Sequence, residues 1–248
     1  MSGEVGYELF GDSADGSVIW NAVVEAGKEF GLRQLGQRSL MLNHLQAFFP
    51  TIWVDFIPAI VSGAEALHRS PVDYGWDRLV DKTRDFPGKA AIMAEAADPK
   101  TKCVTLEWNS EDCIQIFASL FDQENEAFEQ MPLPVNTSDF SAACPQFIPA
   151  FSKDHQMIGL VSNRGYSCQY KKVISLANID IRYAQEGTEV YVLYGSEGHR
   201  QSHDPRHCNQ NSLQGRPAQI RENCMNPSPN QILTQICYSI SPLQLSWF

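Results

Sequence analysis

The spacing of apolar residues predicts a strand, a helix and a second strand in the first 45 residues. Residues 5–10 form a short apolar segment that is typical of a strand. In residues 18–30 apolar positions recur along one face of a helix, with Ser17 placed to cap its start and Gly31 to end it. Residues 39–45 form another apolar segment, which we predict to be a strand. This order is typical of a small α+β unit.

The next part of the chain is rich in proline and aromatic residues. Residues 50–75 therefore predict an irregular loop, and residues 76–93 have a helical pattern that Pro87 and Gly88 interrupt. Two interpretations of the aromatic residues stay open: they line a ligand pocket, or they dock two domains against each other. The residues concerned are Phe48, Phe49, Trp53 and Phe56.

A domain boundary is predicted near residues 98–100, where the pattern changes. A strand follows at 104–108, and Ser110 is a candidate cap for the helix after it. Beyond a proline-rich loop at 132–149, three β-branched segments predict strands, with residues 185–187 as a hairpin turn. The three segments are 157–162, 173–183 and 188–194. Several strands with one helix near their start indicate a small barrel or sandwich.

Composition excludes several classes of function. The chain has 19 basic and 29 acidic residues and a net charge of −10, which argues against binding nucleic acid or an anionic membrane. The longest apolar stretch, 47–61, is broken by Pro50, Asp55 and Pro58, so no membrane span is expected. The start of the chain lacks the features of a signal peptide, and the seven cysteines include no CxxC pair. We therefore expect a cytoplasmic protein.

Residues 199–248 differ in composition from the rest of the chain. They contain no lysine, four arginines, two acids, seven glutamines and five prolines, and we predict an unstructured tail. If the codons of residues 202–210 are read one base later, the genetic code forces a largely β-branched series. We therefore hypothesise that this tail is out of frame. An intact frame in the sequenced gene would refute this hypothesis.

The same tail contains a candidate zinc site that we do not favour. His199, His203 and His207 follow the i, i+4, i+8 spacing of one helical face, and Cys208 adds a thiol. Pro205 lies inside that supposed helix and is incompatible with it. We interpret the cluster as accidental, and no metal site is predicted.

Several segments resemble the glycine-cleavage aminomethyltransferase family. Residues 2–9, SGEVGYEL, resemble the family's TGEDGYE segment, and residues 31–38, GLRQLGQR, resemble its GL…GARD segment at the expected distance. Residues 43–50 are more similar to tetrahydrofolate-dependent O-demethylases that act on vanillate- and syringate-type methyl ethers. Residues 104–112 resemble the opening of the family's C-terminal barrel. Its later strands are matched by 172–177 and 187–190.

The resemblance implies a domain organisation. It implies that residues 1–98 are the closing, C-terminal part of a folate-binding α+β domain and that residues 100–198 are a small C-terminal β-barrel. Residues 199–248 would follow as the tail. Family members are much longer and begin with a folate-binding region that precedes the TGEDGYE segment. The chain therefore resembles only their C-terminal portion, and the family's reactive-centre residues lie largely outside it.

We predict three cofactor-binding residues: the resemblance implies Glu4 and Arg38, and Tyr7 is added because it alternates with Glu4 and Glu8 along the chain. Glu4 matches a glutamate that faces the pterin in relatives, where a carboxylate accepts from an amino group and a ring N–H. Arg38 matches an arginine near the folate, and Tyr7 lies on the same predicted strand as Glu4. Each has a plainer interpretation: Glu4 as a solvated surface acid, Arg38 as the ion-pair partner of an acid such as Asp12, and Tyr7 as a core residue.

Two functional hypotheses follow from the resemblance. In the first, the chain is part of an enzyme that passes a methyl group from a methoxylated aromatic compound to tetrahydrofolate. In the second, it is a non-catalytic folate-binding or interaction fragment. No catalytic residue is assigned: His44 has no identifiable partner acid, and Ser39 replaces the acid that usually follows the family's arginine. Cys103 and Cys113 are interpreted as buried small hydrophobic residues.

Overall fold

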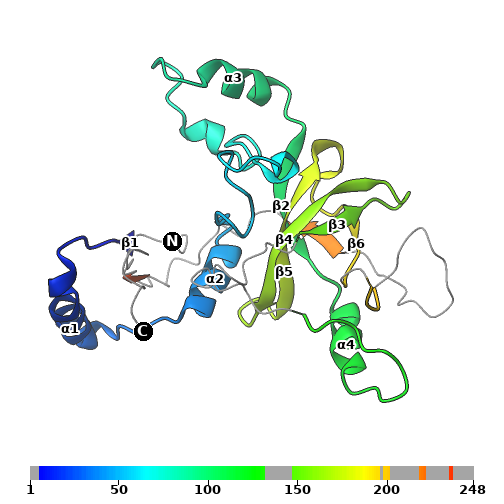
Figure 1. The fold of residues 1–248 in the computed structure, drawn as a ribbon, viewed down its shortest axis with the longest axis horizontal. Coiled ribbons are helices and arrows are strands. Elements are labelled where there is room, and N and C mark those ends of the chain that lie inside the picture. Colours follow the sequence, from blue (N-terminus) through cyan, green and yellow to red (C-terminus); the bar gives the residue numbers. More distant parts are fainter. Residues whose placement is uncertain (1–5, 132–146, 196–197, 202–217, 222–234, 237–248) are drawn as a thin grey trace.

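The computed structural model describes residues 6–131, 147–195, 198–201, 218–221 and 235–236 (Figure 1). The helices are α1 (Gly16–Gly27), α2 (Gln37–Gln46), α3 (Lys89–Ala97) and α4 (Ser110–Ser119). The strands are β1 (Gly6–Tyr7), β2 (Thr101–Glu107), β3 (Ile148–Phe151), β4 (Met157–Ser167), β5 (Lys172–Asp180), β6 (Glu189–Val192), β7 (Ala218–Arg221) and β8 (Gln235–Ile236). No helix in this described part of the chain is long and apolar enough to cross a membrane.

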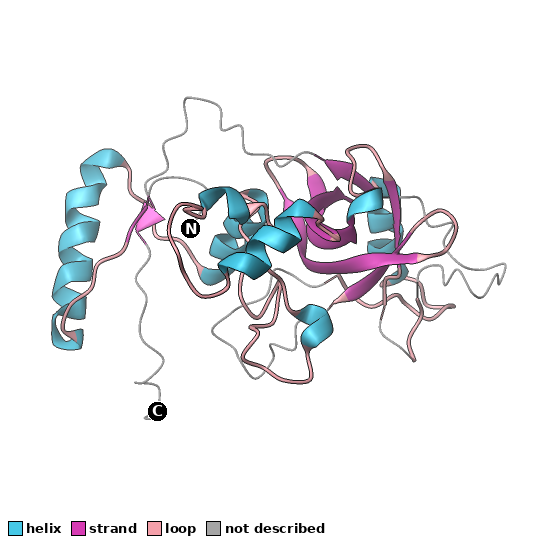
Figure 2. Cartoon of the chain, turned by 90° about the horizontal axis from the view of Figure 1, so that it is seen from above, coloured by secondary structure: helices cyan, strands magenta, loops and turns pink. Residues whose placement is uncertain are grey.

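Six strands form a curled antiparallel sheet in the order β2-β5-β4-β3-β6-β7. Strand β7 pairs with β2 as well as with β6, so the ladder of hydrogen bonds closes on itself. The short strands β1 and β8 pair in parallel, separately from this sheet. Figure 2 shows α1 at one end of the molecule and the sheet at the other. The combination of helices and an antiparallel sheet confirms the predicted α+β class.

The two faces of β2 and β5 contribute to two different cores. Val104 and Leu106 on β2 point to the inside of the curled sheet, as do Ala177 and Ile179 on β5. Alternate residues face outward because side chains along a strand point to opposite faces. The outward core consists of Leu45, Phe48, Tyr74, Cys103, Ile174 and Leu176. The sheet is therefore buried on both sides here, and α2 with the loop after it covers the outer side.

Strand β4 contains an irregularity that shapes this outer side. Its pairing with β5 shifts register between Val161 and Arg164, as in a β-bulge, so Ser162 and Asn163 break the alternation of the strand. Earlier in β4, a Cβ on Gly159 would lie 2.1 Å from the carbonyl oxygen of Asn178. Only glycine permits this approach of β4 to β5.

The structure confirms the first helix but corrects its start and the segment after it. Helix α1 begins at Gly16, so Ser17 lies inside the helix and is not its cap. Helix α1 and the 3-10 turn after it end at Gly31, whose φ of 70° is the left-handed conformation that favours glycine. Residues 39–45, predicted to be a strand, lie in α2. The buried residues of α2 are Met41, His44 and Leu45, which follow the i, i+3, i+4 spacing of one helical face. A short apolar run does not by itself distinguish helix from strand.

The cap of α4 differs from the prediction by one residue. Asn109, not Ser110, is the N-cap, and its side-chain oxygen accepts from the backbone N–H groups of Glu111 and Asp112. Both residues are good caps by type, but only the extended backbone of Asn109 leaves its side chain free to turn back over the first turn.

The structure also corrects the predicted hairpin. Residues 185–187 do form a turn, with Gly187 at φ 80° and the Thr188 N–H donating to Gln185. The flanking strands do not pair with each other, because β5 pairs with β2 and β4 while β6 pairs with β3 and β7. The sequence pattern also missed β3, which begins at the end of the segment predicted to be a loop.

The predicted tail contributes one strand to the sheet. Strand β7 lies within residues 199–248 and pairs with β2 and β6. Most of that segment lies outside the described residues, so the prediction of an unstructured, out-of-frame tail stays a prediction.

Candidate functional site

The structure describes two of the three predicted cofactor-binding residues. Tyr7 is on β1 and 64% exposed, and Arg38 is exposed in the first turn of α2. Glu4 lies outside the described residues. Among those described, Arg38 forms no ion pair with Asp12, and no hydrogen bond joins it to Tyr7. Both side chains are therefore accessible to a ligand, although the structure shows no contact between them.

The loop after α2 gathers a row of aromatic rings on the outer side of the sheet. Neighbouring rings have centroids 5.1–6.3 Å apart, within the range of favourable aromatic pairs. In order of contact they are His44, Phe49, Trp76, Tyr74 and Phe56. Phe48 is buried beside them with φ 52°, a left-handed conformation at the end of α2.

This arrangement supports the docking interpretation of the loop. Phe48 belongs to the core that includes Ile174 and Leu176 of β5, and Phe56 packs against the same core. Leu45 of α2 completes the contact from the helix. The aromatic residues thus attach the region before residue 98 to the sheet.

A buried carboxylate anchors the same loop to the bulge of β4. Asp55 accepts hydrogen bonds from the Ser162 hydroxyl at 2.5 Å, the Thr51 N–H at 2.8 Å and the Asn163 N–H at 3.2 Å. Burial raises the pKa of Asp55 to about 6, although these three donors oppose that shift. Asp55 therefore acts as a hydrogen-bonded link between segments more than 100 residues apart.

His44, in α2, is buried beside the same loop. Its Nδ1 lies 3.0 Å from the Thr51 hydroxyl oxygen, and the side chain is nearly fully covered. Burial lowers the pKa of His44 to about 4, so the imidazole is neutral at pH 7. His44 therefore lies in the core, and a neutral imidazole does not suit a group that must donate a proton to a leaving phenolate.

A second buried acid supports the chain just before the sheet. Asp73 accepts from the Ser70 N–H at 2.9 Å and from the Thr101 hydroxyl, and its backbone oxygen accepts from the Cys103 N–H. No role was predicted for Asp55 or Asp73 from the sequence. The signal available in the sequence was a single acid inside an apolar, aromatic segment. Such a segment is buried, and an acid can be buried only when hydrogen-bond donors surround it.

The cysteines and the candidate zinc ligands have separate outcomes. Cys103 is buried, as predicted, and burial raises its pKa well above the ordinary value. Cys113 is half-buried against the inner core, and burial raises its pKa to about 11. In the part of the chain that the structure describes, no group of three metal-binding side chains occurs. Of the histidine cluster, only His199 is described.

Comparison with known proteins identifies relatives over most of the chain, although no family model matches it. Sesamin methylene transferase of a Sinomonas species is 29% identical, and the match covers 80% of this chain and 51% of that protein. Syringate O-demethylase of a Sphingobium species is also 29% identical, covering 79% of this chain and 46% of that protein. The chain is thus similar to proteins with aminomethyltransferase-like names. The resemblance seen in its motifs is thereby confirmed.

More distant relatives carry the family's own name. An aminomethyltransferase of Leptospira biflexa is 24% identical over 77% of this chain and 42% of that protein. The chain spans about half the length of the methylene transferase and the O-demethylase. A solved aminomethyltransferase T from Bartonella henselae has a TM-score of 0.38 at 13% identity, and the match covers 63% of this chain and 32% of that one.

Proposed function

We propose that this chain is part of a tetrahydrofolate-dependent methyl- or aminomethyltransferase, most similar to aromatic O-demethylases that pass a methyl group to tetrahydrofolate. The observation that carries the proposal is the match to a methylene transferase and to an O-demethylase over about four fifths of the chain. Both names describe transfer of a one-carbon group from an aromatic compound. The substrate class that follows is a methoxylated aromatic compound.

The domain assignment is part of this proposal. Residues 1–98 would be the C-terminal part of the folate-binding domain, and residues 100–198 would form most of the family's C-terminal barrel. The antiparallel sheet order β2-β5-β4-β3-β6, whose strands all lie within residues 100–198, supports the second assignment. The aromatic loop and Asp55 support the first, because they hold the region before residue 98 against that sheet.

The proposed cofactor contacts use the chemistry of tetrahydrofolate. Its pterin presents neighbouring N–H donors, which suit the carboxylate of Glu4, and its glutamyl tail presents carboxylates, which suit the planar guanidinium of Arg38. Tyr7 offers an exposed ring beside Glu4 in sequence. When bound, tetrahydrofolate would supply N5 as the acceptor of the methyl group. The residues named here bind and orient, and none is proposed to move a proton.

Calorimetry with the purified 248-residue chain tests the cofactor assignment. We expect saturable tetrahydrofolate binding that Glu4→Ala and Arg38→Ala each weaken by about tenfold, since each removes a charged hydrogen-bond partner. Glu8→Ala and Arg33→Ala are matched controls because both side chains are exposed and lie a few residues away. Absence of binding by a chain with native circular dichroism, or equal losses in the controls, would contradict the assignment.

A second measurement separates an enzyme from a binding fragment. The chain is incubated with tetrahydrofolate and syringate or vanillate, and mass spectrometry follows the transfer of the methyl group. Methyltetrahydrofolate formed with the chain, and not without it, supports the transferase. Binding without turnover would support the alternative, a non-catalytic folate-binding or interaction fragment. Buried, neutral His44 is the observation that favours this alternative.

A further inference from the structure

One carboxylate oxygen, from the loop after α2, bonds both residues of the bulge in β4. Ser162 and Asn163 of β4 together stand opposite a single residue of β5, Leu176. The Oδ1 atom of Asp55 accepts from the Ser162 hydroxyl at 2.5 Å and from the Asn163 N–H at 3.2 Å. The bulge is therefore bonded to a segment more than 100 residues away in the chain.

The bulge also buries an amide group that its own surroundings do not satisfy. Asn163 is 4% exposed, and within the part of the chain that the structure describes neither its side-chain oxygen nor its side-chain nitrogen has a hydrogen-bond partner. A buried amide without partners destabilises the conformation that buries it. The bonds to Asp55 oppose this effect, so we expect the bulge to depend on them.

The bulge determines which face of the sheet Arg164 occupies. Arg164 pairs with Ser175, and directly opposed residues of neighbouring strands share a face. Ser175 faces the inside of the curled sheet, where its hydroxyl accepts from the indole N–H of Trp108 at 2.9 Å. Arg164 is 6% exposed, and its guanidinium carbon lies 6.0 Å from the centre of the Tyr194 ring.

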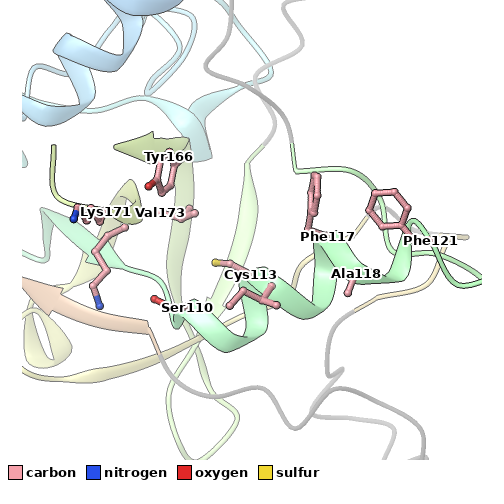
Figure 3. A pocket seen from close by; sticks show the side chains of 10 residues that line it. Ser110, Cys113, Phe117, Ala118, Phe121, Tyr166, Lys171 and Val173 are labelled. Atoms are coloured by element: carbon pink, nitrogen blue, oxygen red, sulfur yellow. The ribbon is translucent and has the colours of Figure 1, made fainter. Parts of the chain in front are cut away.

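The same register shapes the surface at the end of the β4–β5 hairpin. Tyr166 pairs with Val173, and Figure 3 shows both beside the groove that α4 forms with the hairpin. This groove has a volume of about 590 Å³. Its wall on the hairpin side therefore depends on the bulge four residues before Tyr166.

Regular pairing of the two strands would not suit the residues after Ser162. Without the bulge, each of them would move to the opposite face of the sheet. Arg164 would then oppose Ile174, which belongs to the outward core. Because a guanidinium in an apolar core is strongly unfavourable, the hairpin end would detach and would not pair again one residue along.

We propose that Asp55 is a positioning residue that acts through Ser162 and Asn163. By accepting from both, it keeps Arg164 inside the curled sheet and Tyr166 in the wall of the groove. The loop after α2 thereby controls the conformation of the β4–β5 hairpin. This proposal does not depend on the proposed transferase function, and its tests use the chain without tetrahydrofolate.

Amide hydrogen exchange followed by nuclear magnetic resonance tests the proposal. In Asp55→Ala, exchange of amides 164–167 should increase at least about tenfold more than exchange of amides 103–106 in β2, because the hairpin end opens while the sheet stays folded. Asp55→Asn should keep both rates in the parent's ratio to within about threefold, since its amide oxygen accepts in place of Oδ1.

Val54→Ala is the matched control for a general loss of stability. Val54 is buried in the same loop, and its truncation leaves the carboxylate in place. It should therefore accelerate exchange of the two groups of amides alike. Equal acceleration of the two groups in Asp55→Ala, or selective acceleration of 164–167 in Val54→Ala, would overturn the proposal.

The Nε–H resonance of Arg164 is a second readout, because the Tyr194 ring shifts it. In Asp55→Ala it should move toward the position of an arginine in an unfolded chain, and in Asp55→Asn it should stay in place. The backbone contact between Tyr166 and Val173 should likewise be lost only in Asp55→Ala. An unchanged Arg164 resonance in Asp55→Ala would contradict the proposal.

Two milder substitutions test the same contact from the β4 side. Ser162→Ala removes one of the two donors and should accelerate exchange of amides 164–167 selectively, by at least about threefold. Asn163→Ala keeps the backbone donor and removes the unsatisfied amide, so exchange there should be unchanged or slower. Selective acceleration in Asn163→Ala, or none in Ser162→Ala, would show that Asp55 does not hold the bulge.

Discussion

His44 and Asp55 both contact Thr51, and their pKa values are shifted in opposite directions. His44 contacts the hydroxyl of Thr51, and Asp55 accepts from its backbone N–H. Burial favours the neutral form of both groups, so it lowers the pKa of His44 to about 4 and raises that of Asp55 to about 6. The two residues therefore give the protein opposite responses to pH in the same range.

The sign of each contribution follows from proton binding. Between about pH 4 and 6.5 the unfolded chain protonates His44 and the folded chain does not, so the free energy of unfolding rises with pH. Between about pH 4 and 6 the folded chain retains the proton of Asp55 and the unfolded chain does not, so that contribution falls with pH.

Replacing His44 or Asp55 singly should reveal how the remaining residue makes the free energy of unfolding depend on pH. Between pH 4 and 6.5, the free energy of unfolding of His44→Gln should rise by about 1–2 kcal/mol less than that of the parent chain, after allowing for partial solvent screening. Asp55→Asn should change the slope in the opposite direction. Urea unfolding at four pH values across this range measures both. Parallel pH profiles for the parent chain and His44→Gln would show that His44 titrates alike in both states.

At the scale of the element, α4 owes its start to one side chain. Asn109 satisfies two backbone N–H groups that have no partner within the helix, and Glu111 and Asp112 add negative charge at the positive end of the helix dipole. Ser110 is already the first helical residue.

Removal of the N-cap side chain of α4 should destabilise the protein. Asn109→Ala should lower the free energy of unfolding by about 1 kcal/mol, because two helix N–H groups lose their acceptor. Asn109→Asp should retain most of the cap's contribution to stability, and Ser110→Ala should change the free energy of unfolding by less than about 0.5 kcal/mol. Urea denaturation measures all three. A larger loss in Ser110→Ala than in Asn109→Ala would show that the helix begins one residue later.

At the scale of the whole molecule, the region before residue 98 and the sheet share a core. Leu176 of β5 is fully buried and packs in the same cluster as Leu45 and Phe48. The Gln46 amide donates to Ser167 at 2.6 Å, and Ser162 donates to Asp55. These contacts join segments more than 100 residues apart, so we expect the two regions to unfold together.

Truncation of Leu176 tests this coupling. Leu176→Ala should lower the free energy of unfolding by about 2–5 kcal/mol, since it leaves a cavity in the shared core. Pulsed hydrogen exchange across the urea transition, read by mass spectrometry of peptic peptides, reports separately on the region before residue 98 and on the sheet. Their transitions should coincide in both proteins and shift together. Exposed Ile181→Ala is the control. Separate transitions in the unmodified chain would show that the two regions unfold independently.

Local pattern was sufficient for the elements whose signals lie within a few neighbouring residues. The helical face of residues 18–30 and its end at Gly31 depend on contacts within three or four residues, and the structure contains both. The β-branched segments that became β4, β5 and β6 were visible for the same reason. The family resemblance also came from the sequence, because its motifs keep their order and spacing.

The sequence alone determined the α+β class, most strands, the irregular aromatic loop and the family relationship. Only the tertiary structure decided that residues 39–45 are helical, that β5 and β6 do not pair, and that Asp55 is buried. Each depends on partners far along the chain: α2 is selected by the core it completes against β5, and Asp55 by donors on β4. Periodicity reports which face of a segment is apolar, whereas pairing and burial depend on which distant segment meets that face.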